Sequence, residues 1–188
     1  MSEAAPLTGE PLAIDLVNTR TAGPDLLATT EQLRLWLGLE ADRLPDDLHS
    51  AASGSALAAV RRIRDHTAAA LEALLRGARP PASALRGLEA ALAAAPARTR
   101  LDWDGSAVTA TTGREGGRAE RLAAVLAEAA VALLTDPSIG RLRRCEAEDC
   151  VLLFLPAHPR RRWCSPERCG NRVRVARYYE RRKRTAGD

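Results

Sequence analysis

The sequence lacks several features that would assign it to a familiar class of protein. None of its apolar runs approaches the roughly 18 residues that a transmembrane helix needs. Its first residues, MSEAAPLTGEPLAIDLV, contain neither the basic segment nor the continuous apolar core of a signal peptide. It also has no glycine-rich phosphate-binding loop, no internal repeat, and no serine or cysteine with an evident histidine partner. We therefore expect a soluble cytoplasmic protein that is not an enzyme and does not contact a membrane.

Cysteine is missing from the first 144 of the 188 residues, and all four cysteines lie in the last 44. In a reducing cytosol, clustered cysteines are more often metal ligands or redox groups than structural disulfides. The chain is long enough for one main globular body and at most a small appended module. The cysteines place that module at the C-terminal end.

Charge is unevenly distributed along the chain. Residues 1–140 contain 14 basic and 18 acidic side chains, whereas residues 141–184 contain 14 basic and 5 acidic ones. Lysine is nearly absent, with Lys183 the only one, so almost all of this positive charge is arginine. A region of this sign attracts polyanions, with nucleic acid the first expectation and an anionic membrane the second.

The first two thirds of the chain have the pattern of a helical domain. Apolar side chains recur at steps of three and four over residues 53–76, 83–95 and 117–135, which predicts three helices. A shorter helix capped by Thr30 should bury Leu33, Trp36 and Leu37, and ADRLPDDLHS should form a loop. Residues 98–112 alternate around Asp104-Gly105, as in a β-hairpin. We expect a mainly α fold with a small β-hairpin: a helical domain over 1–138, a second module over 139–184 and a tail over 185–188.

The cysteine spacing predicts one Zn²⁺ ion bound by four thiolates. The ligands are Cys145-x4-Cys150 and, after 13 residues, Cys164-x4-Cys169, which gives two tight turns and a connector long enough to bring them together. VLLFL should be a strand, residues 160–163 the returning strand, and Ser165-Pro166 the start of a helix that carries Cys169. This order describes a treble-clef-like zinc finger. An unmetallated redox cluster is the alternative, and His158 is expected to be a loop residue.

The last helix can be divided by angle into two faces. Cys169, Val173, Ala176 and Tyr179 should face the zinc and the hairpin, and Arg172 should brace the thiolates or nearby carbonyls. The candidate nucleic-acid contacts are the exposed basic residues Arg160, Arg161, Arg162, Arg174, Arg177, Arg181, Arg182, Lys183 and Arg184. A solvated face would normally mix signs, but between Arg168 and Arg184 the only acid is Glu180. Phosphate contacts of this kind position a protein without identifying bases.

Two stretches resemble a known family. The run RRRWCSPERCGNRVRVARYYERRK, preceded by RRCEAEDCVLLFL, resembles the CGNR zinc-finger family, whose name stands here as Cys169, Gly170, Asn171 and Arg172. The opening GEPLAIDLVNTR, Trp36-Leu37 and the helix containing Arg64 resemble the ABATE-type helical domain that precedes this finger. The resemblance implies a bacterial, stress-induced transcription regulator whose finger binds DNA, with Asn171 and Arg172 as structural residues around the metal. Its helical domain would sense a small effector or form a homodimer.

The same resemblance places Asp15, Asn18 and Arg64 among apolar neighbours. Our first interpretation is structural: a buried Asp–Arg pair, with the asparagine bonded to a loop. A small-ligand pocket formed by these three residues is the alternative. Three other functions stay open for the chain: an RNA or ribosome partner that stacks bases on Tyr178, Tyr179 and Trp163, a small-molecule enzyme or sensor with a structural zinc appendage, and a redox sensor that releases zinc.

Overall fold

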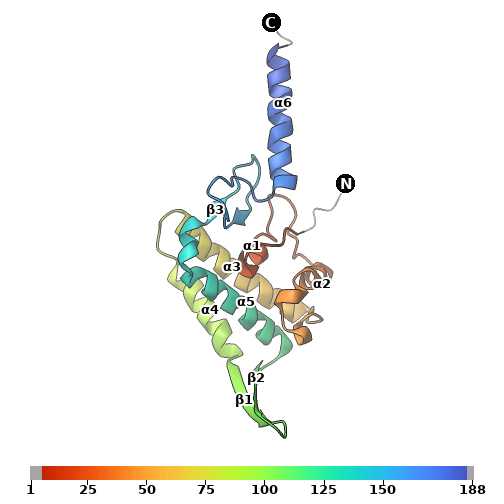
Figure 1. Ribbon diagram of the computed structural model, residues 1–188, viewed down its shortest axis with the longest axis vertical. Helices are drawn as coiled ribbons and strands as arrows, with labels where there is room; N and C mark the ends of the chain where they lie inside the picture. Colours follow the sequence, from red (N-terminus) through yellow and green to blue (C-terminus); the bar gives the residue numbers. More distant parts are fainter. Residues whose placement is uncertain (1–5, 186–188) are drawn as a thin grey trace.

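The computed structural model describes residues 6–185, which form a helical body, a cysteine-containing module and a long projecting helix (Figure 1). In the last helix, the side chains of Arg177, Tyr179, Glu180, Arg181 and residues 183–185 lie outside the described set. Within the described residues, none of the helices combines the length and the apolar character needed to cross a membrane.

The helical body contains five α-helices, two short 3₁₀ turns and a hairpin. These are α1 (Leu12–Val17), α2 (Thr30–Leu39), η1 (Ala41–Arg43), η2 (Asp46–Leu48), α3 (Gly54–Leu75), α4 (Ala82–Ala94), β1 (Ala97–Trp103), β2 (Val108–Arg114) and α5 (Arg118–Thr135). The C-terminal module contains η3 (Pro137–Arg141), β3 (Arg143–Arg144), β4 (Leu153–Phe154), the π-helical turn η4 (Pro166–Gly170) and α6 (Asn171–Thr185). The prediction of a mainly helical chain with small hairpins is confirmed.

The core of the body lies where α3, α4 and α5 pack together, with α1 against α3 and α5 (Figure 1). The three predicted long helices all form, and their apolar faces are buried through residues such as Val60, Ile63, Leu88 and Leu126. Ser53 caps α3 by accepting a hydrogen bond from the Ala56 amide. Alanines alternate with the larger side chains along these faces, so the helices approach closely.

The prediction for the short second helix was wrong at its start. The cap is Thr29 rather than Thr30: its hydroxyl accepts from the Gln32 amide, and the Gln32 side chain accepts from the Thr29 amide in return. Trp36 and its neighbours are buried as predicted. The segment expected to be a loop contains η1 and η2 instead, because Leu44 and Leu48 enter the core and pull the chain into short turns.

The predicted β-hairpin is present and extends from the body rather than packing on it (Figure 1). Trp103 pairs with Val108 at the tip and Ala97 with Arg114 at the base. Four residues connect the strands, starting at Asp104, whose carboxylate accepts from the amides of Ser106 and Ala107. Gly105 takes φ +102°, in the region that favours glycine.

The small sheet of the C-terminal module differs from the prediction. Strand β4 pairs with β3, the segment that precedes Cys145, and residues 160–163 form no strand. The free edge of β4 is already occupied by the helical body, because the backbone of Leu153 bonds to Asn18 and the Leu155 amide donates to Glu10. A returning strand therefore has no edge to join, and a backbone bond from the Glu146 amide to the Arg162 carbonyl connects that segment to the first cysteine turn.

The last helix begins as predicted and then leaves the module. Ser165 caps the turn by accepting from the Arg168 amide, and Pro166 occupies its first position. Val173 packs against the cysteine cluster, but Ala176, predicted on the same inward face, is exposed. The inward face ends there because the module is small and the helix continues past it into solvent (Figure 1).

Candidate metal centre

The four cysteine sulfurs form a compact cluster. Cys145, Cys164 and Cys169 are buried, Cys150 is partly exposed, and the four Sγ atoms all lie within 4.8 Å of one another. Sulfur separations are 3.9 Å from Cys150 to Cys164 and 3.6 Å from Cys164 to Cys169. Tetrahedral zinc with Zn–S bonds of about 2.3 Å places its sulfurs about 3.8 Å apart. The cluster therefore fits one Zn²⁺ ion, and its separations are much longer than a disulfide bond.

Local backbone geometry aims the sulfurs inward. In the first turn the Cys150 amide donates to the Ala147 carbonyl, and Asp149 takes φ 60°, which allows the chain to reverse before Cys150. The Cys145 amide donates to Leu152, which ties this turn to the base of β4. In the second turn the Cys169 amide donates to Ser165.

The pKa values of the cysteine thiols indicate that four thiolates need a bound cation to coexist. The pKa of Cys150 is lowered to about 5 because the Cys164 thiol shares a hydrogen bond with its sulfur. The corresponding bond, together with burial, raises the pKa of Cys164, and burial raises the pKa of Cys169 to about 11. Cys150 therefore ionises easily, whereas Cys164 and Cys169 ionise with difficulty. A divalent metal supplies the positive charge that lets all four exist together.

Arg172 reaches the cluster from α6. Its Nη2 donates to the Glu148 carbonyl at 2.9 Å and lies 3.7 Å from the Cys169 sulfur. This guanidinium connects the first cysteine turn with the second. The Asn171 side chain is exposed, and its backbone amide donates to the Pro166 and Arg168 carbonyls, where η4 passes into α6.

Arg161 is only partly exposed, and its guanidinium bonds to groups in both parts of the protein. Its guanidinium donates to Glu10 and to the Cys164 carbonyl, both at 2.6 Å, and stacks 4.5 Å from the Phe154 ring centre. Glu10 is buried and also accepts from the Leu155 amide at 2.9 Å. This arginine therefore connects the metal module to the helical body.

Asn18 makes the second connection between the two parts. Its amide nitrogen donates to the Leu153 carbonyl at 2.9 Å, and its oxygen accepts from the Leu153 amide at 2.8 Å. The Leu153 side chain enters the core of the helical body, whereas Phe154 packs in the cysteine module. Strand β4 thus belongs to both cores.

The predicted pair between Asp15 and Arg64 does not form. Asp15 instead accepts from Arg43 at 2.5 Å and from the amides of Gly9 and Glu10, which fixes the loop that presents Glu10. Glu40 is a second buried carboxylate against the same Arg43. Burial raises the pKa of both carboxyl groups, and the nearby Asp15 carboxylate raises the pKa of Glu40 further.

Arg64 belongs to a separate cluster. It is 1% exposed and holds Asp25 with two bonds of 2.5 and 2.7 Å, and it also donates to the Thr19 hydroxyl. The Arg64 guanidinium lowers the pKa of Asp25 to about 2. Asp15, Asn18 and Arg64 therefore do not converge on one pocket: each is bonded to a different protein partner.

The remaining candidate nucleic-acid contacts differ in their surroundings. Arg160, Arg174 and Arg182 are exposed, and Arg162 is exposed but paired with Glu146 at 2.5 Å. Arg174 leans back toward the Gly170 carbonyl at 3.4 Å. The side chains of Arg177, Arg181, Lys183 and Arg184 lie outside the described residues.

Sequence reasoning missed Glu10, Asp25 and Arg43, which are the actual partners of the predicted polar residues. Glu10 and Asp25 precede and follow the apolar helix α1, where a buried acid would be unexpected, and no spacing rule connects them to Arg161 or Arg64. Glu10 lies within GEPLAIDLVNTR and Asp25 lies soon after it, but Arg43 has no such signal.

Two known families match this chain, and the boundary between the two matches lies near the boundary between the helical body and the cysteine module. Residues 10–137 match the family ABATE, described as "Putative stress-induced transcription regulator", and residues 141–182 match the CGNR zinc finger. No curated protein matches the chain significantly. The finger match agrees with the sulfur geometry, so the cofactor is one zinc ion held by the four cysteines.

Proposed function

Since the chain belongs to the ABATE family and ends in a CGNR zinc finger, we propose that it is a cytoplasmic, non-enzymatic transcription regulator that binds DNA through that finger. The observation that carries this proposal is the position of α6, which projects clear of the body (Figure 1), together with its basic sequence. The segment from Arg168 to Arg184, ends included, contains eight basic residues and one acid.

In this proposal the metal is structural. Zinc and Arg172 fix the first turn of α6, and the rest of the helix carries its arginines away from the protein, where a duplex can approach. Arg160, Arg174 and Arg182, together with Arg177, Arg181, Lys183 and Arg184, contact phosphates. Arg161 and Arg162 are left out of this set, because the Arg161 guanidinium is bonded to Glu10 and Cys164 and the Arg162 guanidinium is paired with Glu146.

The test is DNA binding by the zinc-loaded full chain, measured by fluorescence anisotropy at several salt concentrations. Affinity should fall steeply with salt, and each lost phosphate contact should reduce the slope of log K against log salt by about 0.9. Arg160→Gln and Arg174→Gln should each weaken binding to all duplexes. Arg86→Gln, an exposed arginine of α4, is the matched control and should change nothing. Absence of salt-sensitive binding to any duplex would refute the proposal.

RNA binding is the second candidate, because Tyr178 is half exposed on α6 beside Arg182 and offers a stacking surface. Direct competition between duplex DNA and structured RNA separates the two. If RNA displaces DNA at equal salt and Tyr178→Ala removes only the RNA affinity, RNA is the partner. Selection of bound fragments from genomic DNA would then show whether one sequence is preferred.

We assign the regulatory role, through a small effector or a homodimer, to the helical domain. The Asp15, Asn18 and Arg64 side chains are used by the protein's own structure, so an effector would have to bind elsewhere. Thermal-shift screening of the full chain against metabolites tests for such an effector, and a uniformly flat response would count against one.

A further inference from the structure

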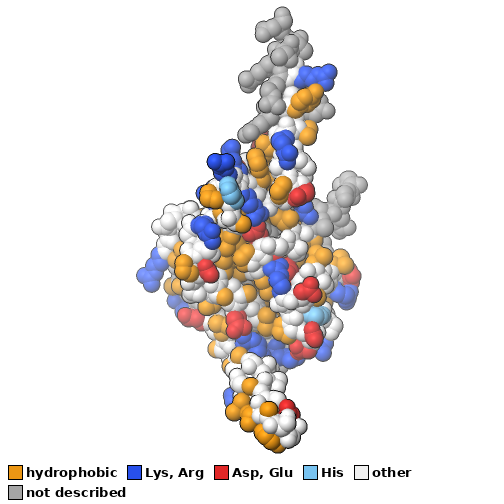
Figure 2. All heavy atoms as spheres, viewed as in Figure 1, with side chains coloured by type: hydrophobic (Ala, Val, Ile, Leu, Met, Phe, Trp, Pro, Cys, Tyr) orange, Lys and Arg blue, Asp and Glu red, His pale blue; other side chains and the backbone are white. Residues whose placement is uncertain are grey.

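The β1–β2 hairpin presents an apolar face that nothing in its own chain covers. All residues of β1 are exposed, and the three large apolar residues of the hairpin are 72% exposed at Leu101, 60% at Trp103 and 66% at Val108. The register places Trp103 opposite Val108 and Leu101 opposite Ala110, so these side chains share one face. Asp102 lies on the other face. Figure 2 shows hydrophobic side chains gathered over the end of this arm.

Such an arm is unexpected in a chain that acts alone. An isolated two-stranded hairpin is marginally stable in water, and contiguous exposed apolar surface marks an interaction site. Tryptophan is also among the residues that most often dominate protein interfaces. Nucleic acid is a poor fit for this partner, because the apolar face has no basic residue near its tip, Arg100 lies on the opposite face, and the arm lies at the opposite end of the molecule from α6 (Figure 1).

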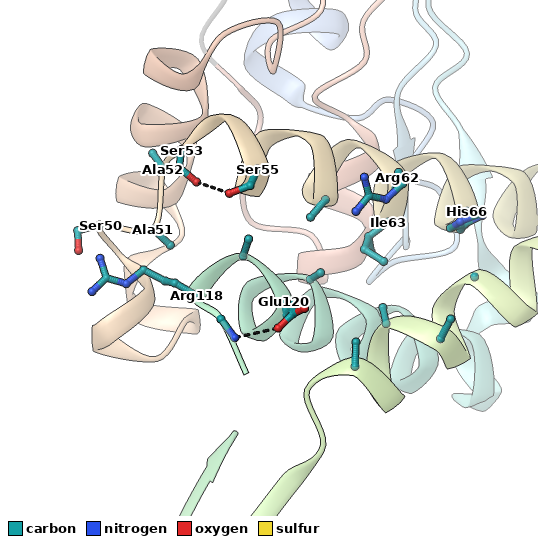
Figure 3. Close-up of a pocket in the computed structure, with 18 residues that line it drawn as sticks. Ser50, Ala51, Ala52, Ser53, Ser55, Arg62, Ile63, His66, Arg118 and Glu120 are labelled. Carbon is teal, nitrogen blue, oxygen red and sulfur yellow. Dashed lines mark hydrogen bonds between the residues drawn. The ribbon is translucent and has the colours of Figure 1, made fainter. Parts of the chain in front are cut away.

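A cleft opens at the base of the same arm. It has a volume of about 920 Å³ and lies between α3, α4 and α5, reaching Ala94 just before β1 and Gly117 just after β2. Its floor is apolar, formed largely by alanines and Ile63. Figure 3 shows Arg62 and His66 extending from α3 and Arg118 from the start of α5 around it. Among the described side chains, neither arginine has a carboxylate partner.

The tip and the cleft are complementary in both polarity and charge. The tip combines Leu101 and Trp103 with the carboxylates of Asp102 and Asp104, and the cleft combines an apolar floor with the guanidinium groups of Arg62 and Arg118. The carboxylate that also lines the cleft, Glu120, already accepts a hydrogen bond from the Gly117 amide. Seven strand residues span roughly 23 Å at about 3.3 Å per residue, so the tip lies one arm length from its own cleft. It reaches an equivalent cleft only in a second molecule.

In a dimer with twofold symmetry, both hairpin tips can occupy both clefts at once. If two arms lie side by side in opposite directions, each tip reaches the base of the other arm, which is where the partner's cleft opens. The apolar tip of each arm then lies beside the base of the other, where Ala97, Thr99 and Thr112 occupy the same face, and both copies make the same contacts, as an isologous interface requires. We propose that the chain forms a homodimer by this exchange of arms, with the tip of each hairpin in the partner's cleft. The inference rests on the regulatory role proposed above for the helical domain.

The test is sedimentation equilibrium of the zinc-loaded full chain without DNA. The wild-type chain should dimerise, and Trp103→Ser should raise the dimer dissociation constant at least about tenfold. Leu35→Ser is the matched control, because Leu35 is a comparably exposed apolar residue on α2, and it should leave the constant unchanged. A wild-type chain that stays monomeric, or a dimer indifferent to Trp103→Ser, would overturn the proposal.

Charge exchange tests the contact itself. Asp102→Arg and Arg62→Asp should each weaken self-association, and a mixture of the two variants should form a mixed dimer more tightly than either variant with itself. Asp104 is left intact because it holds the turn. A mixture that associates no better than its components would place the interface elsewhere. DNA is absent from these measurements, so DNA binding by monomeric variants can be measured separately and can stand if the dimer fails.

Discussion

The side-chain amide of Asn18 exchanges two hydrogen bonds with the backbone of Leu153, a residue 135 positions further along the chain. The Asn18 side chain takes the place of a neighbouring strand, because it hydrogen-bonds both the amide and the carbonyl on the free edge of β4. The zinc finger is therefore not suspended on a linker. It is fixed to the helical domain by Asn18 at β4, by Glu10 at Leu155 and Arg161, and by the Leu153 side chain in the core.

Replacing Asn18 by alanine should loosen this connection. The buried amide and carbonyl of Leu153 would lose their partners, which costs about 1–3 kcal/mol of unfolding free energy for each unsatisfied group. Urea unfolding measures the loss, and limited proteolysis should show faster cleavage near residues 136–142. Zinc content should stay at one per chain. Asn171→Ala, which removes the same side chain at an exposed position, should stay within about 0.5 kcal/mol of wild type.

Removing zinc should unfold the finger while the helical domain keeps its structure. Structural zinc sites contribute about 10 kcal/mol or more of folding free energy, and no cysteine lies in the main core. Treatment with a chelator should abolish salt-sensitive DNA binding and expose residues 143–170 to protease, and returned zinc should restore both. Metal analysis should give one zinc per wild-type chain and less for Cys169→Ser. A chelated chain that resists protease throughout this region would contradict the assignment.

The long helices and the metal ligands were predictable from the sequence, whereas the hydrogen-bond partners of the buried polar residues were not. The three long helices follow from repeated apolar spacing, and the metal ligands from the spacing of four cysteines, because in both cases the signal is local. The cap at Thr29 and the course of residues 160–163 were missed. The first depends on which of two adjacent threonines meets Gln32, and the second depends on an edge of β4 that the distant Asn18 occupies.

The partners of the buried charges were unpredictable for the same reason. Asp15 and Arg64 are both buried ions, so pairing them was the simplest hypothesis from the sequence. Each instead meets a residue on a loop or short turn, Arg43 for Asp15 and Asp25 for Arg64. Residues in loops and short turns follow no repeating apolar spacing, so the sequence does not indicate which of them will pair. The result is two ionic clusters with opposite responses to pH.

The Asp25–Arg64 pair should stabilise the fold at neutral pH. The pKa of Asp25 is lowered from 3.8 to about 2, so its contribution is fully present above pH 3.8 and is lost as the pH falls toward 2. Because a quarter of the side chain is exposed and solvent screens the pair, we expect Asp25→Asn to cost about 1–2 kcal/mol at pH 7. The difference from wild type, measured by urea unfolding, should shrink between pH 4 and 2. Asp65→Asn, which breaks the exposed pair with Arg20, should show little effect at any pH.

Glu40 should respond to pH in the opposite direction. Burial raises its pKa above 4.5, so the folded chain holds a proton that the unfolded chain has released, and stability falls as the pH rises from 4.5 through the folded pKa. Two carboxylates, Asp15 and Glu40, face the single guanidinium of Arg43, which leaves one negative charge uncompensated in this buried cluster.

Glu40→Gln should therefore gain stability relative to wild type as the pH rises through that window, since glutamine keeps an oxygen for Arg43 and removes the excess charge. The comparison is made by urea unfolding from pH 4 to 8. Glu31→Gln is a close control, because Glu31 also pairs with an arginine three residues along the chain but is exposed, so removing its charge should change stability little. If Glu40→Gln follows the pH dependence of wild type, Glu40 ionises in the fold as freely as in water. The excess negative charge would then have no energetic effect, and the raised pKa would be wrong.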